Sequence, residues 1–460
     1  MAKPSIPQGT RDFSAEVVRK RNFIFSTIKK VFEVYGFEPL ETPAIENLET
    51  LIGKYGEEGD KLMYKILNNG ISNPKNMEKS KAGFEKVLEG KSSSDLTERA
   101  LKYDLTIPFA RYVAMNHGRL TFPYRRFQIQ PVWRGDSPQK GRYREFTQCD
   151  ADVVGSYSLI NEVELASIYH DVFSKLGIKG YEIRINSRKI LTALAEVCGE
   201  PGKVVEITTA IDKLDKIGID KVKEELKTKD LTDDQVNLIE SYLTMNSEAN
   251  AGNQAKITAL KHFFNDSDEG KKGIKELEFV TANIAADVNI IIDVTLARGL
   301  NYYTGIIFEA KAPATVKIGS IGGGGRYDDL TGLFGVPNIP GVGISFGVDR
   351  IYDVMTEMNL FPDEVGSGTQ VLFFNMGETE SRFAFDIMQQ LRHSGVACEM
   401  YHEPVKINKQ FSYAEKKNIT YAAIIGSQEI EQKYCIVKNL KTSMQEVVIF
   451  DKLAEYFKNI

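Results

Sequence analysis

The sequence predicts an α+β protein in which a mostly antiparallel α+β domain carries a helical insertion and is followed by a small α/β module. Three stretches of the 460 residues predict this class. Residues 121–155 alternate aromatic, apolar and basic side chains, as two long paired strands do. Residues 190 to about 280 are rich in Lys, Glu, Leu and Asn at helical spacing. Beyond residue 368, short apolar runs alternate with helical patterns.

The N-terminal part predicts a helix followed by an edge strand. Apolar residues recur with a helical period over residues 14–34, and Ser14 is the expected N-cap. The helix is expected to end at Gly36, after which two prolines interrupt the strand pattern of residues 37–46. Because prolines in a sheet belong at edges or bulges, we expect this strand at an edge.

The middle of the chain predicts an insertion, a hairpin and a helical segment. Residues 68–100 are polar, rich in Gly and Ser and weakly periodic, which indicates a partly mobile insertion. Residues 135–141 are expected to join the two strands of the hairpin. The helical insertion is placed at about 195–280, and the β-branched run 288–294 then returns the chain to the sheet.

The C-terminal part predicts a separate domain. Residues 361–368 are expected to link a domain at 1–360 to a domain at 369–460. In the second domain strands and helices are expected to alternate, with strands at 371–374, 397–401, 421–425, 434–437 and 447–450 and helices at about 378–393 and 407–418.

Composition and charge narrow the class of protein. With 42% hydrophobic and 26% charged residues and no apolar run near the ~20 residues that span a bilayer, the chain is expected to be soluble, with no membrane partner. Its first residues resemble neither a secretory signal nor an Arg-rich presequence, so we expect a cytoplasmic protein. The net charge of −5 means that a polyanion partner would need a local basic surface. The four cysteines form no C-x-x-C pair and the five histidines show no ligand spacing, so no protein-ligated metal is expected.

Two segments rich in glycine and tyrosine, Ala297–Gly305 and Gly322–Asp328, are the most informative functional signals. Each places an arginine beside glycines that let the backbone approach a ligand, and beside phenol hydroxyls that can read a small polar molecule. The same residue types also serve turn geometry in strand–turn–strand units, so either segment alone leaves both interpretations open.

The expected hairpin carries seven cations and one acid between residues 119 and 144. Arg134 and Arg142 flank the turn and Phe146 follows it, which suits a triphosphate bent over a stacked purine. For the other arginines of the first strand region, a solvated face of the hairpin is the preferred interpretation: these are Arg119, Arg125 and Arg126.

Two further segments carry candidate binding residues. Residues 341–350 alternate glycine with apolar residues and end on Arg350, which leaves room for a flat base and offers a cation to a terminal phosphate, while the phosphate-loop pattern of ordinary NTPases is absent. Asp104 and Thr106 share one face of a strand end and suit an ammonium group. The alternative is a turn that Asp and Thr cap before a helix starting at Pro108.

Together these segments resemble the class II aminoacyl-tRNA synthetases and, through the two glycine–tyrosine segments, the histidyl-tRNA synthetase family in particular. The resemblance covers nearly the whole chain. It implies a class II antiparallel-sheet catalytic domain with a helical insertion and a C-terminal α/β anticodon-binding domain. The helix at 14–34 and the proline-containing strand resemble the family's first motif, which builds a homodimer interface, although an ordinary α/β edge has the same pattern.

The resemblance also implies roles for individual residues. The α-amino group of L-histidine would be held by Asp104, Thr106 and Gln148, and its imidazole nitrogens would be bound by Asp152 and Tyr303, with Tyr302 in the same site. The α-phosphate and the substrate carboxylate would be bound by Arg134, and the outer phosphates of ATP by Arg142 and Arg350. Phe146 would stack on adenine, and Arg298 would be the catalytic cation. One or two Mg²⁺ ions are expected on the β- and γ-phosphates. The chain departs from the family pattern at Asp152, where Glu is common, and at Asn301, where Asp is usual and where we favour a turn residue.

The implied activity is ATP-dependent activation of histidine to histidyl-adenylate, followed by transfer to the 3′ end of tRNA(His). The alternative is a regulatory subunit of ATP phosphoribosyltransferase, a paralogue that senses histidine without catalysis. That paralogue lacks the anticodon domain and tends to lose the catalytic motif residues, both of which are present here. A pseudo-synthetase module of a translation-control kinase would need an attached kinase domain, which this length excludes.

Overall fold

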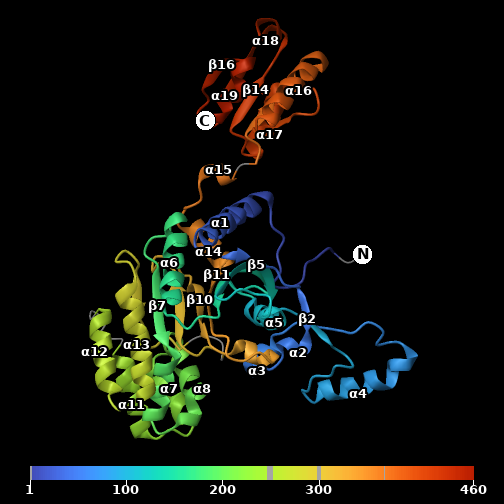
Figure 1. The fold of residues 1–460 in the computed structure, drawn as a ribbon. Coiled ribbons are helices and arrows are strands. Elements are labelled where there is room, and N and C mark those ends of the chain that lie inside the picture. The colour runs from blue at the N-terminus through green and yellow to red at the C-terminus, as the bar shows by residue number, and fades with distance from the viewer. Residues whose placement is uncertain (1–2, 246–251, 298–301, 367, 460) are drawn as a thin grey trace. The chain divides into compact units, whose positions relative to one another are not determined.

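The structure is a computed structural model that describes residues 3–245, 252–297, 302–366 and 368–459 (Figure 1). It divides into two compact units. The first comprises residues 1–11 and 24–360, and the second comprises residues 12–23 and 361–460. In the described part of the chain, no helix is long and apolar enough to cross a membrane.

The first unit is built on an eight-stranded sheet. All neighbouring pairs are antiparallel except the two outermost pairs, β1–β5 and β7–β8. Its spatial order is β1 (Glu38–Pro39), β5 (Tyr124–Trp133), β6 (Glu145–Val154), β11 (Gly341–Gly347), β10 (Ser320–Tyr327), β9 (Ile306–Lys311), β7 (Glu182–Ser187) and β8 (Ile290–Ile292). This arrangement confirms the predicted hairpin, which is the β5–β6 pair.

One face of this sheet packs against helices and forms the core. On β6, the residues Cys149, Ala151 and Val153 are buried on this face, whereas the alternating positions carry polar side chains on the other. Phe346 of β11 lies 5.9 Å from Phe32 of α1 (Ala15–Val34) and 4.8 Å from a tyrosine of α6 (Ile160–Lys175). Because this face is covered, the polar face is left to build a site.

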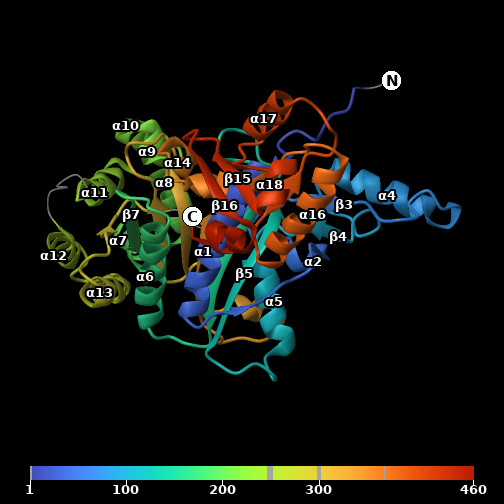
Figure 2. The same cartoon turned by 90° about the horizontal axis from the view of Figure 1, so that it is seen from above.

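A cluster of helices packs at the β7 side of the sheet, where Figures 1 and 2 show it in green and yellow. The helices α7 and α13 both contact β7. Its members are α7 (Arg188–Val197), α8 (Val204–Asp212), α9 (Leu214–Ile217), α10 (Ile219–Lys227), α11 (Asp233–Thr244), α12 (Asn253–Phe263) and α13 (Asp268–Asn283). The predicted helical character of this region is confirmed, while the strand β7 before it was not predicted.

A three-stranded sheet carries the segment between the first helix and the hairpin. Its order is β2 (Ile45–Asn47), β4 (Arg99–Leu101) and β3 (Lys65–Ile66), accompanied by the short helices α2 (Leu48–Leu51) and α3 (Gly56–Lys61). Residues 77–88 form a regular helix, α4 (Met77–Leu88), so the expectation of a weakly structured insertion at 68–100 is corrected here. The helix escapes the sequence pattern because large apolar residues such as Phe84 and Leu88 are exposed and give no buried stripe.

The second unit contains a five-stranded sheet with helices α16 (Glu378–His393) and α17 (Ile407–Lys416). Its order is β13 (Cys398–Met400), β12 (Val371–Phe373), β14 (Tyr421–Ile424), β15 (Tyr434–Asn439) and β16 (Gln445–Ile449), followed in sequence by α19 (Leu453–Lys458). The predicted alternation of strands and helices is confirmed element by element. The expected linker contains a short helix, α15 (Asp363–Gly366), and the domain boundaries 1–360 and 369–460 stay a prediction.

Candidate active site

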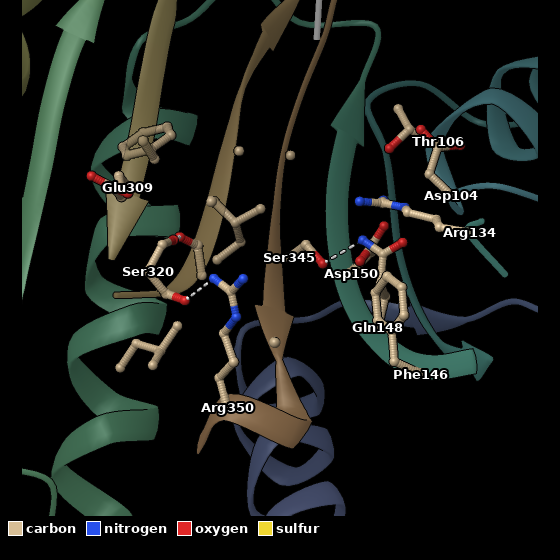
Figure 3. A pocket seen from close by; sticks show the side chains of 18 of the residues that line it. Asp104, Thr106, Arg134, Phe146, Gln148, Asp150, Glu309, Ser320, Ser345 and Arg350 are labelled. Atoms are coloured by element: carbon tan, nitrogen blue, oxygen red, sulfur yellow. Dashed lines mark hydrogen bonds between the residues drawn. The ribbon is translucent and has the colours of Figure 1, made fainter. Parts of the chain in front are cut away.

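A cavity of about 520 Å³ lies on the polar face of the eight-stranded sheet. Strands β6, β10 and β11 form its wall, and α5 (Thr106–Asn116) begins at its edge. Figure 3 shows Asp104, Thr106 and Arg134 on one side of this cavity and Ser320 and Arg350 on the other, with Ser345 of β11 between them. Segments far apart in sequence therefore meet at one pocket.

Asp104 is held at the start of α5. Its Oδ1 accepts hydrogen bonds from the Tyr55 hydroxyl at 2.8 Å and from the backbone N–H of Ile107 at 3.1 Å, and its Oδ2 accepts one from the Tyr302 hydroxyl at 3.3 Å. The carboxylate thus caps the helix, as the turn interpretation predicted, and lines the cavity as well. Burial raises the pKa of Asp104, and the N–H and hydroxyl donors oppose this shift. The helix begins at Thr106, two residues before the expected Pro108.

Asp152 on β6 is fixed by two strong partners. The Tyr327 hydroxyl donates to its Oδ1 at 2.6 Å, and Arg126 on β5 forms an ion pair with its Oδ2 at 2.9 Å. A Cβ on Gly343 across the strand pair would lie 2.0 Å from Asp152 Oδ1, so only glycine leaves room for this carboxylate. Burial raises the pKa of Asp152, and the Arg126 charge opposes the shift.

Arg126 contradicts the expectation of a solvated hairpin face. Its side chain is 0% exposed, stacks over Phe109 at 4.2 Å and neutralises Asp152. The alternation of the strand placed it correctly on one face, but the sequence does not show that α5 covers that part of the face. Arg125 points the other way and pairs with Glu164 at 3.0 Å.

The tyrosines of the first glycine–tyrosine segment lie against the carboxylates. Tyr302 and Tyr303 form an edge-to-face pair at 5.0 Å and both line the cavity. Burial raises the pKa of both phenols, and the nearby carboxylates Asp104 and Asp152 add to the shift, so both hydroxyls are neutral donors at physiological pH. A Cβ on Gly325 would lie 2.8 Å from the Tyr303 ring, which explains a glycine at this position.

Arg134 and Arg350 of the cavity donate hydrogen bonds to backbone carbonyls. Arg134 Nε donates to the Tyr103 carbonyl at 3.0 Å, and its guanidinium lies 5.1 Å from the Phe146 ring centre. Arg350 donates to the carbonyls of Gly141 at 2.9 Å and Ser320 at 2.7 Å. These bonds orient the two guanidinium groups.

Arg142 is the most exposed cation of this end. Its side chain is 50% exposed, and Asp136 approaches it at only 3.9 Å. On the same side, Arg11 stacks over the Tyr143 ring at 3.2 Å and pairs with Asp349 at 2.7 Å. Sequence reasoning missed Arg11, because nothing in a single N-terminal arginine signals a contact more than 300 residues away.

All predicted site residues that the structure describes line this one cavity. They are Asp104, Thr106, Arg134, Arg142, Phe146, Gln148, Asp152, Tyr302, Tyr303 and Arg350. Arg298 and Asn301 lie outside the described residues. The individual roles of these residues stay predictions, but their meeting at one pocket follows from the fold.

The arginine of the second glycine–tyrosine segment has a structural contact. Arg326 is 3% exposed and forms two hydrogen bonds with Glu162 of α6, at 2.5 and 2.8 Å. It therefore anchors β10 to the helix layer. Asp150 and Ser345 also line the cavity, and the sequence analysis gave them no role. Asp150 alternates with Gln148 and Asp152 along one strand, which was a signal that could have identified it. Ser345 alternates in the same way with the glycines of its strand.

Comparison with known proteins agrees with this site. A family model described as Histidyl-tRNA synthetase matches residues 86–351, and one described as Anticodon binding domain matches residues 370–460. The Histidine–tRNA ligases of Christiangramia forsetii and Bacteroides fragilis are 50% and 49% identical to the chain, with at least 98% of each chain covered.

Solved structures give the same result for the fold. The histidyl-tRNA synthetase of Nostoc sp. PCC 7120 is 31% identical, with a TM-score of 0.82 and 100% of both chains covered. A Bacillus halodurans protein described as an ATP phosphoribosyltransferase regulatory subunit/histidyl-tRNA synthetase is 18% identical, with a TM-score of 0.68 over 90% of this chain and 97% of that one. The second likeness shows the fold alone.

The largely antiparallel sheet, the cavity on it that carboxylates and arginines line, and the C-terminal anticodon-binding module define a class II aminoacyl-tRNA synthetase. Within that class, identity near 50% over almost the full length and the match of the central family model narrow the assignment. The chain belongs to the histidyl-tRNA synthetase family.

Proposed function

We propose that the cavity activates L-histidine with ATP to give histidyl-adenylate and that the chain then transfers histidine to the 3′ end of tRNA(His). The chain is an aminoacyl-tRNA ligase, like its curated relatives named Histidine–tRNA ligase. The observation that carries the proposal is the polarity of the cavity. Asp104, Asp150 and Asp152 are buried together at one end, with Arg134 beside Asp104. Arg142 and Arg350 lie at the other end, where Glu309 and Asp349 also line the cavity. An amino acid with a cationic portion fits the buried carboxylates, and a triphosphate fits the arginines.

The proposed chemistry follows from this polarity. The histidine carboxylate attacks the α-phosphate in line and expels pyrophosphate, and both reactants are anions that repel each other. Arg134 lies between Asp104 and Phe146 and would hold the carboxylate and the α-phosphate together. Arg350 and Arg142 would bind the outer phosphates, and Arg298 would contribute the charge that develops in the transition state.

Mg²⁺ would enter this site with the nucleotide. Within the described residues no group of three or more His, Cys, Asp or Glu side chains could hold a metal ion. The phosphate oxygens of the nucleotide are the hard donors that Mg²⁺ prefers. Bound there, the ion would neutralise charge on the pyrophosphate leaving group. The arginines of the cavity would orient the same phosphates.

An ATP–pyrophosphate exchange assay with each of the twenty amino acids tests the proposal. We expect histidine alone to support exchange, because the buried carboxylates and neutral phenols match a ring that donates and accepts hydrogen bonds. Exchange with another amino acid would contradict the substrate. No exchange with any amino acid would favour the regulatory paralogue, which the relatives near 50% identity do not favour.

The tRNA and dimer partners are further parts of the proposal. Residues 370–460 match an anticodon-binding model, so we infer that removing residues 368–460 keeps histidine-dependent exchange and raises the KM for tRNA. Light scattering on the full chain would test the homodimer inferred from the first helix and the β1 edge. The same measurement on the truncated chain must show whether that dimer is kept. A truncated dimer that charges tRNA as well as the full chain would contradict the tRNA role. The cytoplasm stays the predicted location.

A further inference from the structure

Asp150 is a buried carboxylate beside Asp104 and Asp152 to which the proposed function gives no role. It lies on β6 between Gln148 and Asp152, on the same strand face as both. Its side chain is buried, with 2% of its surface exposed. Figure 3 shows Asp150 beside Gln148 and near Ser345 at the wall of the cavity. A buried, ionisable group in a substrate pocket calls for a partner.

The three carboxylates of this end differ in what already binds them. Asp152 has Tyr327 on one oxygen and Arg126 on the other. Asp104 accepts hydrogen bonds on both oxygens from phenols and a backbone N–H. Among the described residues, Asp150 Oδ1 has no hydrogen-bond partner. Asp152 Oδ2 and Gln148 Oε1 also accept no hydrogen bond, but Asp152 Oδ2 has the Arg126 charge at 2.9 Å. Asp150 Oδ1 is therefore the carboxylate oxygen of this end that has neither a hydrogen bond nor an ion pair among the described residues.

Ser345 orients this carboxylate. It lies directly opposite Asp150 in the β6–β11 pair. Gln148 Nε2 donates to Ser345 Oγ at 2.9 Å, and Ser345 forms a side-chain hydrogen bond with Asp150. A hydroxyl has a single proton, so the one on Ser345 goes to Asp150 while its oxygen accepts from Gln148. One carboxylate oxygen is thus used by the protein and Oδ1 is left for a ligand.

The charges around Asp150 favour a basic ligand. The groups that act on it are Arg126 of β5, Asp152 of β6, Asp104 before α5 and Ser345 of β11. Burial raises the pKa of Asp150 to about 7, with Arg126 opposing the shift and Asp152 adding to it. Because Arg126 and Arg134 are the two arginines that act on three buried carboxylates, the site has an excess of negative charge that a protonable substrate can compensate.

We propose that Asp150 is a specificity-determining residue, whose Oδ1 accepts a hydrogen bond from an imidazole N–H of the substrate. This inference rests on the proposed function and names the ligand class as an amino acid with a basic, N–H-bearing ring. Alternate residues on a strand are about 7 Å apart. Asp150 therefore lies one step from Gln148, the proposed partner of the α-amino group, in the direction of the ring. Asp152, which is paired with Arg126, then forms the end of the space that the imidazole ring would occupy.

The test uses the full chain, the variant Asp150→Asn and two substrates with the same α-amino and carboxylate groups. These are histidine and 1,2,4-triazol-3-ylalanine, whose ring is far less basic. In pyrophosphate exchange we expect Asp150→Asn to raise the KM for histidine about tenfold or more and the KM for the triazole analogue about threefold or less, because a charged acceptor is worth most to a basic ring. The KM for ATP should change less than about threefold.

A second variant and a control keep the result interpretable. Ser345→Ala removes the hydroxyl that orients Asp150. It should raise the KM for histidine severalfold and the KM for the triazole analogue by less. Asp353→Asn removes a half-buried carboxylate of α14 (Val348–Glu357) that does not line the cavity, and should leave both KM values within about twofold. Thermal unfolding should show all three variants folded.

Two outcomes would overturn the inference. Equal penalties for both substrates would place Asp150 at the shared α-amino group, and unchanged KM values would remove it from the substrate site. Calorimetric titration with histidine measures the same discrimination without catalysis. A wild-type chain that binds histidine but shows no exchange contradicts the proposed function alone, whereas equal Kd values for wild type and Asp150→Asn contradict the role of Asp150.

Discussion

The two ends of the cavity differ in what their charged side chains contact. At the proposed histidine end, ionisable groups are buried and bind one another, as Asp152 does with Arg126 and Tyr327. At the proposed nucleotide end, Arg134 and Arg350 are half-buried and donate to backbone carbonyls. The first end is a rigid receptor whose fold depends on its charges. The second holds cations that backbone carbonyls orient. Changes at the first end should therefore affect stability, and changes at the second should affect rate.

The largest effect is expected when the buried ion pair is broken. Asp152→Asn leaves Arg126 buried without its counter-ion, which should lower the free energy of unfolding by about 3–5 kcal/mol in urea titrations. Adding Arg126→Met should recover part of this loss, since no orphan charge remains. A single variant within about 1 kcal/mol of wild type would show that the histidine end does not depend on this pair.

Arg134→Ala should separate rate from stability. The side chain is oriented by the Tyr103 carbonyl, and its loss removes a preorganised cation from the reacting phosphate. We expect exchange turnover to fall about 100- to 1,000-fold, equivalent to about 2.7–4 kcal/mol. The urea midpoint should stay close to that of wild type. A large loss of stability with little loss of turnover would reverse the assignment of the two ends.

Two glycines of neighbouring strands sharpen the comparison within the sheet. A Cβ at Gly343 would meet Asp152 Oδ1 at 2.0 Å, whereas a Cβ at Gly323 would meet only the Phe308 carbonyl at 3.5 Å. Gly343→Ala should therefore cost about 1–3 kcal/mol of stability and weaken histidine binding. Gly323→Ala is the matched control and should be nearly neutral for stability. Equal effects of the two variants would indicate that the carboxylate can move aside.

The smallest effect is a pH dependence of stability at the histidine end. The folded pKa of Asp150, about 7, lies above its unfolded value near 3.8, so its contribution is fully present below pH 3.8 and is lost as pH rises through 7. Between pH 5 and 8 the wild type should lose about 1–2 kcal/mol more than Asp150→Asn, since the shift is shared with Asp152 and opposed by Arg126. Parallel pH profiles of the two proteins would contradict this expectation.

The prediction of the fold from sequence succeeded where local signals were strong. Ser14, Gly36 and the apolar period between them gave α1, and the alternation on both sides of residues 135–141 gave the β5–β6 hairpin. It failed where a contact was remote. The strand β7 pairs with β8 and β9, which are about 100 or more residues away in sequence, so its partners could not be predicted. Its own residues, Glu-Ile-Arg-Ile-Asn-Ser, do alternate polar and apolar side chains, and this short signal was overlooked.

The sequence by itself determined the elements and the residue types of the site, because the period of apolar residues and the positions of glycine and proline act locally. Only the tertiary structure decided which charges are free. Arg126 lies on β5 and Arg134 directly follows that strand, yet one is paired with Asp152 in the core and the other lines the cavity. Burial and pairing depend on segments such as α5 and β11, which the chain brings together only when it folds, and these set the charge that Asp150 presents to a ligand.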